Sequence, residues 1–208
     1  MTRLMVGPPT VLIGAFLLTA GCAAAGSPEL QDGDIIFHSS TSSQSEALRL
    51  AMGSPYTHMG IIFVEGGGPV VLEAVGPVKR TPLAEWVGRG EGGRFVVKRL
   101  SDAQALLTAD AIARLKKAGD RYAGRPYDLQ FQWSDERIYC SELVWKTYEE
   151  ALGIEIGELE TFRDFNLSDP AVAKKLEERF GARIPLDEKV ISPASMFESD
   201  RLMTVYEN

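Results

Sequence analysis

The chain has few of the side chains that most catalytic and metal sites require. Its 208 residues include two histidines, His38 and His58, and two cysteines, Cys22 and Cys140. Two histidines without ligand spacing do not make a zinc site, so we expect neither a metal ion nor another cofactor. The G-x-S-x-G motif of many serine hydrolases is also absent. Any site that needs histidine or cysteine must therefore use one of these four residues.

Basic charge is scarce as well. Lys and Arg number 22 against 29 Asp and Glu, which gives a formal net charge of -7. No basic stripe stands out, so nucleic acid is not expected as a partner. A composition of 45% hydrophobic and 25% charged residues is ordinary for one globular domain, and no internal repeat is evident.

The apolar run over residues 11–18 is too short to span a bilayer comfortably. The sequence Leu18-Thr19-Ala20-Gly21-Cys22 closes this segment and resembles a bacterial lipoprotein signal, in which Cys22 becomes the lipidated first residue. We therefore expect a signal peptide over 1–21, a tether over 22–31 and one domain over 32–208. The protein would be an exported, membrane-anchored lipoprotein of the periplasm or outer membrane.

Two alternatives for this segment stay open. Thr19 stands where such signals carry an aliphatic residue, so cleavage elsewhere would release a secreted form. An uncleaved N-terminal anchor is the other alternative. If Cys22 does carry lipid, Cys140 has no disulfide partner, and a lone cysteine in an exported protein is a candidate reactive thiol.

Hydrophobic periodicity predicts an α+β domain, a small sheet with helices grouped around it. The central prediction is a hairpin of strands 57–64 and 69–75, joined by a turn over 65–68. Thr81-Pro82 fits an N-cap followed by proline in the first helical position. The other predicted strands are 34–38, 95–100 and 202–206, and the predicted helices are 45–52, 82–87, 108–122, 140–152, 170–180 and a short one from 193.

Cys140 stands at the start of one predicted helix. Cys140, Leu143, Val144 and Thr147 follow helical spacing, and Gly153 lies just past the end. In the first turn, unpaired backbone N–H groups and the helix dipole favour an anion, so the thiol is biased toward the nucleophilic thiolate. The alternative is a small buried hydrophobe, which free cysteines often are.

A cysteine nucleophile needs a base, and His58 opens the first strand of the hairpin. If residues 65–68 form a four-residue turn, Val64 faces Pro69 and Glu73 is the diagonal neighbour of His58 on the same face. A three- or five-residue turn would put the two on opposite faces. A strand-edge histidine without a catalytic role, and a merely polar strand position for Glu73, are the alternatives.

Five motifs occur in a fixed order, and together they carry a resemblance. They are Asp34–Phe37, Tyr56–Ile61, Leu72–Ala74, Gly124–Asp128 and Tyr139–Val144. Over about residues 30–150 this set resembles the circularly permuted branch of the NlpC-type papain-like hydrolases, the YiiX/YebB group, with the lecithin:retinol acyltransferases as more distant relatives. In this branch the histidine precedes the cysteine, as it does here.

The resemblance implies a papain-like core, with the cysteine helix packed on a small antiparallel sheet. It also implies that Cys140, His58 and Glu73 form a catalytic triad, the same residues that spacing and scarcity indicate. Tyr127 and Tyr139 are candidate substrate-binding residues or second oxyanion donors, although Tyr127 fits core packing at least as well.

Three other features have weaker interpretations. Asp34 and Asp128 are expected to be structural hydrogen-bond acceptors. His38 has no evident triad role, and a polar contact near the cleft is the most that its position indicates. The residues after 155 match no motif and are expected to shape a substrate groove.

The leading hypothesis is a cell-envelope cysteine hydrolase, an amidase or peptidase, that acts on peptidoglycan peptide or another amide. A lipid-acyl hydrolase or acyltransferase at the membrane is the second hypothesis. A non-catalytic envelope binding module is the third. An apolar tunnel at the cleft would favour acyl chains, whereas a polar groove would favour peptide.

Overall fold

The structure is a computed structural model that describes residues 29–42 and 44–208. The predicted signal peptide, Cys22 and most of the predicted tether lie outside these residues. The end of the tether lies on the domain: Arg99 donates a hydrogen bond to the carbonyl of Glu29, and Leu30 packs against buried apolar residues. Over the described ranges, no helix is both long and apolar enough to cross a membrane.

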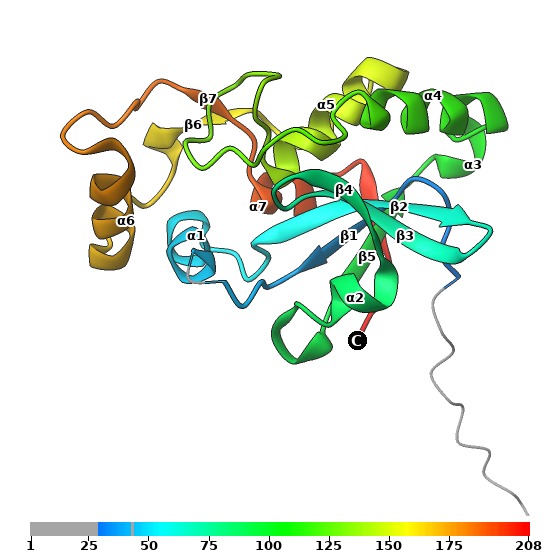
Figure 1. Ribbon diagram of the computed structural model, residues 1–208, viewed down its shortest axis with the longest axis horizontal. Helices are drawn as coiled ribbons and strands as arrows, with labels where there is room; N and C mark the ends of the chain where they lie inside the picture. The colour runs from blue at the N-terminus through cyan, green and yellow to red at the C-terminus, as the bar shows by residue number, and fades with distance from the viewer. Residues whose placement is uncertain (1–28, 43) are drawn as a thin grey trace, which may run out of the picture.

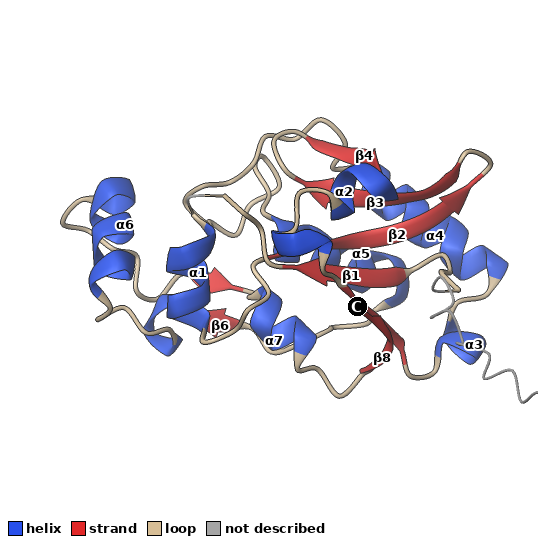
Figure 2. Cartoon of the chain, turned by 90° about the horizontal axis from the view of Figure 1, so that it is seen from below, coloured by secondary structure: helices blue, strands red, loops and turns tan. Residues whose placement is uncertain are grey.

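A six-stranded antiparallel sheet forms the centre of the fold, in the order β4-β3-β2-β1-β5-β8 (Figures 1 and 2). Five of its strands are the predicted ones, each displaced by no more than one residue at either end. The strands are β1 (Asp34–His38), β2 (His58–Glu65), β3 (Gly68–Ala74), β4 (Val78–Pro82), β5 (Val96–Leu100) and β8 (Leu202–Glu207).

Helices cover both faces of this sheet. Figure 1 shows α4 and α5 on one face and α2 on the other, while α1 and α6 lie together beyond one end of the sheet. The helices are α1 (Ser45–Met52), α2 (Leu83–Val87), α3 (Ala103–Leu106), α4 (Ala109–Asp120), α5 (Cys140–Leu152), α6 (Pro170–Phe180) and α7 (Pro193–Phe197), with a small second sheet of β6 (Glu160–Thr161) and β7 (Lys189–Val190) beside them.

Burial of both faces explains the nearly continuous apolar sequence of the central strands. Ile35 and Phe37 belong to the core beneath α5, whereas Ile36 between them packs with Trp86 of α2. Successive residues of a strand point to opposite faces, so a strand covered on both sides needs apolar residues at every position. The covered sheet thereby gives His58, at the start of β2, a rigid support.

One predicted helix start is wrong. Thr81 is not an N-cap: it lies in β4, paired with Val71 of β3, and α2 begins after Pro82. A Thr-Pro pair fits either the start of a helix or the end of an edge strand, and only the pairing with β3 decides between them. The strand β4, the short helix α3 and the β6–β7 pair were not predicted from the sequence.

Candidate active site

Cys140 is the first residue of α5, and its two neighbours are both tied to Ile191. The backbone N–H of Ile191 donates to the Tyr139 hydroxyl at 3.0 Å, and the Ser141 hydroxyl donates to the Ile191 carbonyl at 2.8 Å. The helix ends at Gly153, whose φ of 66° is the left-handed conformation typical of a C-terminal cap. The thiol therefore sits at a helix start that is held from both sides.

The register of the β2–β3 hairpin is the predicted one. Val64 pairs with Pro69, and Gly66 and Gly67 form the tip of the turn. His58 and Glu73 are thereby diagonal neighbours, and His58 Nε2 lies 2.7 Å from Glu73 Oε2. Because an even number of residues lies between the paired positions Val64 and Pro69, the imidazole and the carboxylate come to the same face of the hairpin.

Glu73 is fully buried and is the centre of a hydrogen-bond network. Besides His58, its carboxylate accepts hydrogen bonds from the Thr81 hydroxyl, at 2.5 Å, and from Arg89 Nη2. Burial raises the pKa of Glu73, but the hydrogen bonds and the charge of His58 lower it by more, to about 2. Glu73 is therefore ionised at neutral pH and can hold the proton of His58 on the Nε2 side.

His58 lies between Glu73 and Cys140. Burial lowers the pKa of His58, but its hydrogen bonds with Cys140 and Glu73 raise it by more, to about 9. Burial raises the pKa of the Cys140 thiol, while the hydrogen bond and charge of His58 lower it below its ordinary value. Because Nε2 faces Glu73, Nδ1 is the nitrogen that faces the sulfur. The favoured state is a thiolate beside an imidazolium.

The two tyrosines from the sequence analysis occupy different places. Tyr127 is beside the sulfur: burial raises its pKa well above the ordinary value, and the charge and hydrogen bond of Cys140 add to this shift. Tyr139 is 2% exposed, its ring meets Phe131 edge to face, and its hydroxyl is used by Ile191. Tyr127 is therefore the tyrosine that can reach a group bound at Cys140.

A cavity of about 500 Å³ opens beside His58. We call it the His58 cavity. His58 and Tyr127 line it, whereas Cys140, which is 4% exposed, lies behind them and is not part of the lining. Its lining residues are His38, Ser40, Thr41, Ser42, Gln44, Ser45, Leu48, Thr57, His58, Ala74, Val75, Arg89, Tyr127 and Leu129.

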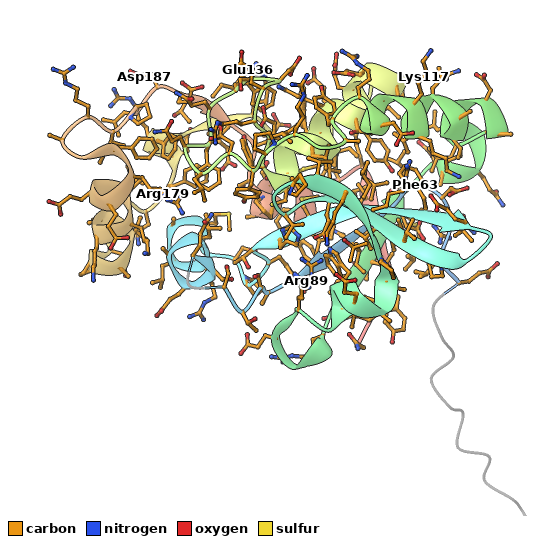
Figure 3. The ribbon with its side chains drawn as sticks, viewed as in Figure 1. Phe63, Arg89, Lys117, Glu136, Arg179 and Asp187 are labelled. Carbon is orange, nitrogen blue, oxygen red and sulfur yellow. The ribbon has the colours of Figure 1, made fainter. Side chains whose placement is uncertain are left out.

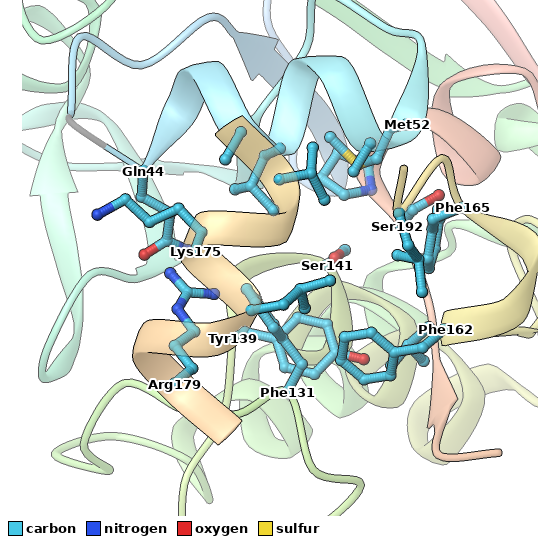
Figure 4. Close-up of a pocket in the computed structure, with 18 of the residues that line it drawn as sticks. Gln44, Met52, Phe131, Tyr139, Ser141, Phe162, Phe165, Lys175, Arg179 and Ser192 are labelled. Atoms are coloured by element: carbon cyan, nitrogen blue, oxygen red, sulfur yellow. The ribbon is translucent and has the colours of Figure 1, made fainter. Parts of the chain in front are cut away.

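A second hollow of about 90 Å³, the apolar pocket, lies between α1, α6 and the segment before α7 (Figure 4). Its walls include Phe131, Tyr139 and Phe162, with Lys175 and Arg179 of α6 at one side. Gln44, the residue before α1, and Leu48 of α1 line both hollows, so the two adjoin at this helix. Residues after 155, among them Phe162 and Lys175, thus line this pocket, and their role in shaping a substrate groove stays a prediction.

Sequence reasoning missed two residues that support Glu73. Figure 3 shows Arg89 on the side of the sheet opposite α4 and α5, in the loop after α2. Arg89 and Thr81 both bind the carboxylate, but nothing in their spacing from Glu73 indicates this, because the contacts arise from β4 and the loop folding back. The predicted structural roles of Asp34 and Asp128 are confirmed: Asp34 accepts from Arg99, and Asp128 accepts from Gln130 and Gln132.

Within residues 29–42 and 44–208, no group of three or more His, Cys, Asp and Glu side chains is placed to hold a metal ion. His58 could offer a metal only Nδ1, because Nε2 is bound to Glu73. The same nitrogen, Nδ1, is the one available for proton transfer to and from sulfur.

The comparisons with known proteins agree with this geometry. A family model described as permuted papain-like amidase enzyme, YaeF/YiiX, matches residues 29–206. The chain belongs to this family. It is 47% identical over 175 residues to a protein of Escherichia coli (strain K12) named as the uncharacterized protein YiiX, with 84% of this chain and 85% of that protein covered.

A solved structure extends the likeness to three dimensions. A crystal structure described as metalloprotein yiiX from Escherichia coli O157:H7 matches with a TM-score of 0.82 and 47% identity, and covers 86% of this chain and 97% of that one. The fold is thus the permuted papain-like α+β fold, as the ordered motifs indicated, and the family is one of papain-like amidases.

Proposed function

We propose that this permuted papain-like amidase is a cysteine hydrolase that cleaves an amide bond, with Cys140 as nucleophile, His58 as acid and base, and Glu73 as the group that orients His58. The observation that supports this most strongly is that His58 is hydrogen-bonded to Glu73 on one side and to Cys140 on the other, while His58 itself lines an open cavity. Peptide from peptidoglycan is the proposed substrate class.

The chemistry follows from the protonation states. The Cys140 thiolate attacks the amide carbonyl, and the backbone N–H of Cys140 at the helix start stabilises the oxyanion, together with the Tyr127 hydroxyl. His58 then gives its proton to the leaving amine, and a thioester to Cys140 remains. Neutral His58 takes a proton from water, which attacks the thioester and releases the acid and the thiolate.

The location that we propose is the cell envelope. The support is the N-terminal sequence alone, with its short apolar run followed by Cys22. Lipid on Cys22 would keep the domain within a short tether of a membrane and leave Cys140 as a free thiol.

The second candidate is hydrolysis or transfer of a lipid acyl group. The observation that favours it is the apolar pocket, which adjoins the His58 cavity at Gln44 and Leu48 and carries Lys175 and Arg179 at its side. A hydrocarbon chain suits such walls, and the two cations suit an anionic head group.

The decisive experiment combines labelling with turnover. Iodoacetamide should label Cys140 at neutral pH in the folded protein, and Cys140→Ala should abolish labelling at this position and turnover while the fold, checked by circular dichroism, survives. Glu73→Gln, which keeps the shape but not the charge, should reduce turnover while Cys140 is still present. Turnover by Cys140→Ala would end the proposal, and an unlabelled wild-type thiol would favour the binding module.

The same proteins separate the two substrate classes. Purified peptidoglycan fragments and an N-acyl ethanolamine lipid would each be incubated with wild type and with Cys140→Ala, and products would be detected by mass spectrometry. Release of peptide products by wild type alone supports the amidase. Release of fatty acid alone supports the lipid candidate.

A further inference from the structure

His38 is a buried histidine that the triad does not use. Its side chain is 1% exposed, and its ring stacks on Trp86 with 3.9 Å between ring centroids and 21° between ring planes. Its backbone pairs with His58 across the β1–β2 ladder, and the two imidazole centroids are 5.3 Å apart. It also lines the His58 cavity. The ring is therefore held rigidly beside the proposed catalytic base.

The Nδ1 edge of this ring is closed by Gly90. Nδ1 is buried and has no hydrogen-bond partner in the part of the chain that the structure describes. A Cβ atom at position 90 would stand 2.8 Å from Nδ1, so a Cα–H of Gly90 points at this nitrogen. A C–H group is a weak donor that suits a lone pair, whereas a buried N–H here would have no acceptor. The neutral ring therefore keeps its proton on Nε2.

The surroundings of His38 also keep the ring neutral. Burial lowers the pKa of His38 most, and His58 and Arg89 lower it further against the opposing effect of Glu73, so that it is about 3. These three charged groups come from β2, from the loop after α2 and from β3, the elements that surround the ring. At neutral pH a neutral His38 thus lies next to a protonated His58.

We propose that His38 is a substrate-binding residue whose Nε2–H donates a hydrogen bond to an oxygen of the group that the substrate places in the His58 cavity. The inference rests on the proposed hydrolase function and adds to it the chemistry that the cavity recognises, an acceptor oxygen of a carboxylate or of a carbonyl other than the one that is cleaved. This part of the wall can donate hydrogen bonds and carries no carboxylate: the hydroxyls of Ser40, Thr41 and Ser42 and the guanidinium of Arg89 line the cavity, and none of its described lining residues is Asp or Glu.

The protonation of His38 can be measured directly, because the chain has only two histidines. Nitrogen-15 NMR of protein labelled in histidine would show two rings, and His38→Phe would assign them. We expect a neutral Nε2–H ring for His38 throughout about pH 5 to about pH 8, where an ordinary histidine titrates. A ring protonated on Nδ1, or one that titrates in this range, would overturn the inference.

Binding is tested with two acetate esters that differ by one carboxylate. The probes are 4-acetoxybenzoate, whose leaving group carries a carboxylate acceptor, and phenyl acetate, which lacks it. His38→Phe keeps a flat ring against Trp86 and removes the donor, whereas His38→Gln keeps an N–H donor. We expect His38→Phe to raise KM for 4-acetoxybenzoate about tenfold and to leave KM for phenyl acetate unchanged. His38→Gln should bring KM for 4-acetoxybenzoate most of the way back to the wild-type value.

The outcomes separate this inference from the proposed function. Equal losses with both esters, or slower iodoacetamide labelling of Cys140 in His38→Phe, would make His38 a support for His58 and overturn the inference. Unchanged kinetics with both esters would overturn it as well. Wild-type protein that neither labels nor cleaves either ester would instead count against the hydrolase function, and the NMR measurement would still decide the protonation of His38.

Discussion

Tyr139 and Ile191 are joined by a hydrogen bond of 3.0 Å, in which the backbone N–H of Ile191 donates to the tyrosine hydroxyl. Both groups are buried, so Tyr139→Phe leaves an N–H without an acceptor. We expect a loss of about 1–3 kcal/mol in the free energy of unfolding, measured by urea denaturation, and slower labelling of Cys140. Tyr206→Phe, at a half-buried strand position, is the control and should change stability by less than about 0.5 kcal/mol. Equal stability of both variants would contradict the prediction.

Gly60 leaves the space that Glu73 needs. A Cβ atom at position 60 would stand 2.5 Å from Val71 Cγ1, 2.6 Å from the Leu72 carbonyl oxygen and 3.4 Å from the Glu73 Cβ. Because a paired backbone oxygen cannot move without opening the ladder, Gly60→Ala should cost about 1–3 kcal/mol in thermal or urea unfolding and separate Glu73 from His58. Gly66→Ala, at the hairpin tip with no atom within 4 Å of its Cβ, is the matched control. A Gly60→Ala protein as active and stable as that control would refute this reasoning.

Labelling of the Cys140 thiol and turnover should depend on pH in different ways. Cys140 has a pKa below its ordinary 9.0, so iodoacetamide labelling should already be substantial at pH values where a free cysteine is protonated. Turnover, which also needs the His58 proton, should fall as the pH rises through about 9, while labelling should not. In His58→Gln the thiol keeps its burial and loses the cation, so its labelling should require higher pH. A wild-type labelling curve that rises only above pH 9 would contradict the thiolate–imidazolium state.

Acid should destabilise the fold through Glu73. Its pKa is about 2 in the folded protein against an ordinary 4.5, so between these values the unfolded chain binds a proton that the folded chain does not. The ionised Glu73 carboxylate contributes at most about 3 kcal/mol to the free energy of unfolding. This contribution is complete above about pH 4.5 and is lost as the pH falls through about 2. The check is urea unfolding across this range.

Two variants complete the acid experiment. Glu73→Gln should show a shallower loss of stability between about pH 4.5 and about pH 2, because its side chain does not titrate. Asp187→Asn removes an exposed carboxylate that pairs with Arg163 on the surface and should leave the slope nearly unchanged. Parallel slopes for wild type and Glu73→Gln would show that another group carries the acid sensitivity.

The part of the site that follows from local rules could be predicted from the sequence. Turn length fixes strand register, and register fixes which side chains share a face, so the approach of His58 to Glu73 was predictable from the residues between them. The start of α5 at Cys140 followed from apolar spacing and from Gly153 at its end.

The part that depends on distant chain segments could not be predicted. Thr81 and Arg89 reach Glu73 only because an edge strand and a glycine-rich loop fold back on β3, and Thr-Pro is ambiguous without that pairing. The amphipathic pattern of α6 predicted a helix but not its neighbour, α1, so the apolar pocket between them was not foreseen in place or size.

The ties from Ile191 to Tyr139 and Ser141 make the cysteine helix depend on the last part of the domain. The hairpin that carries the imidazole and the carboxylate is local in sequence and can close on its own register. The helix that presents the sulfur has both anchors only when residue 191 of 208 has docked. A chain that ends before this residue would therefore keep the imidazole beside the carboxylate and lose both anchors of the helix that presents the thiol.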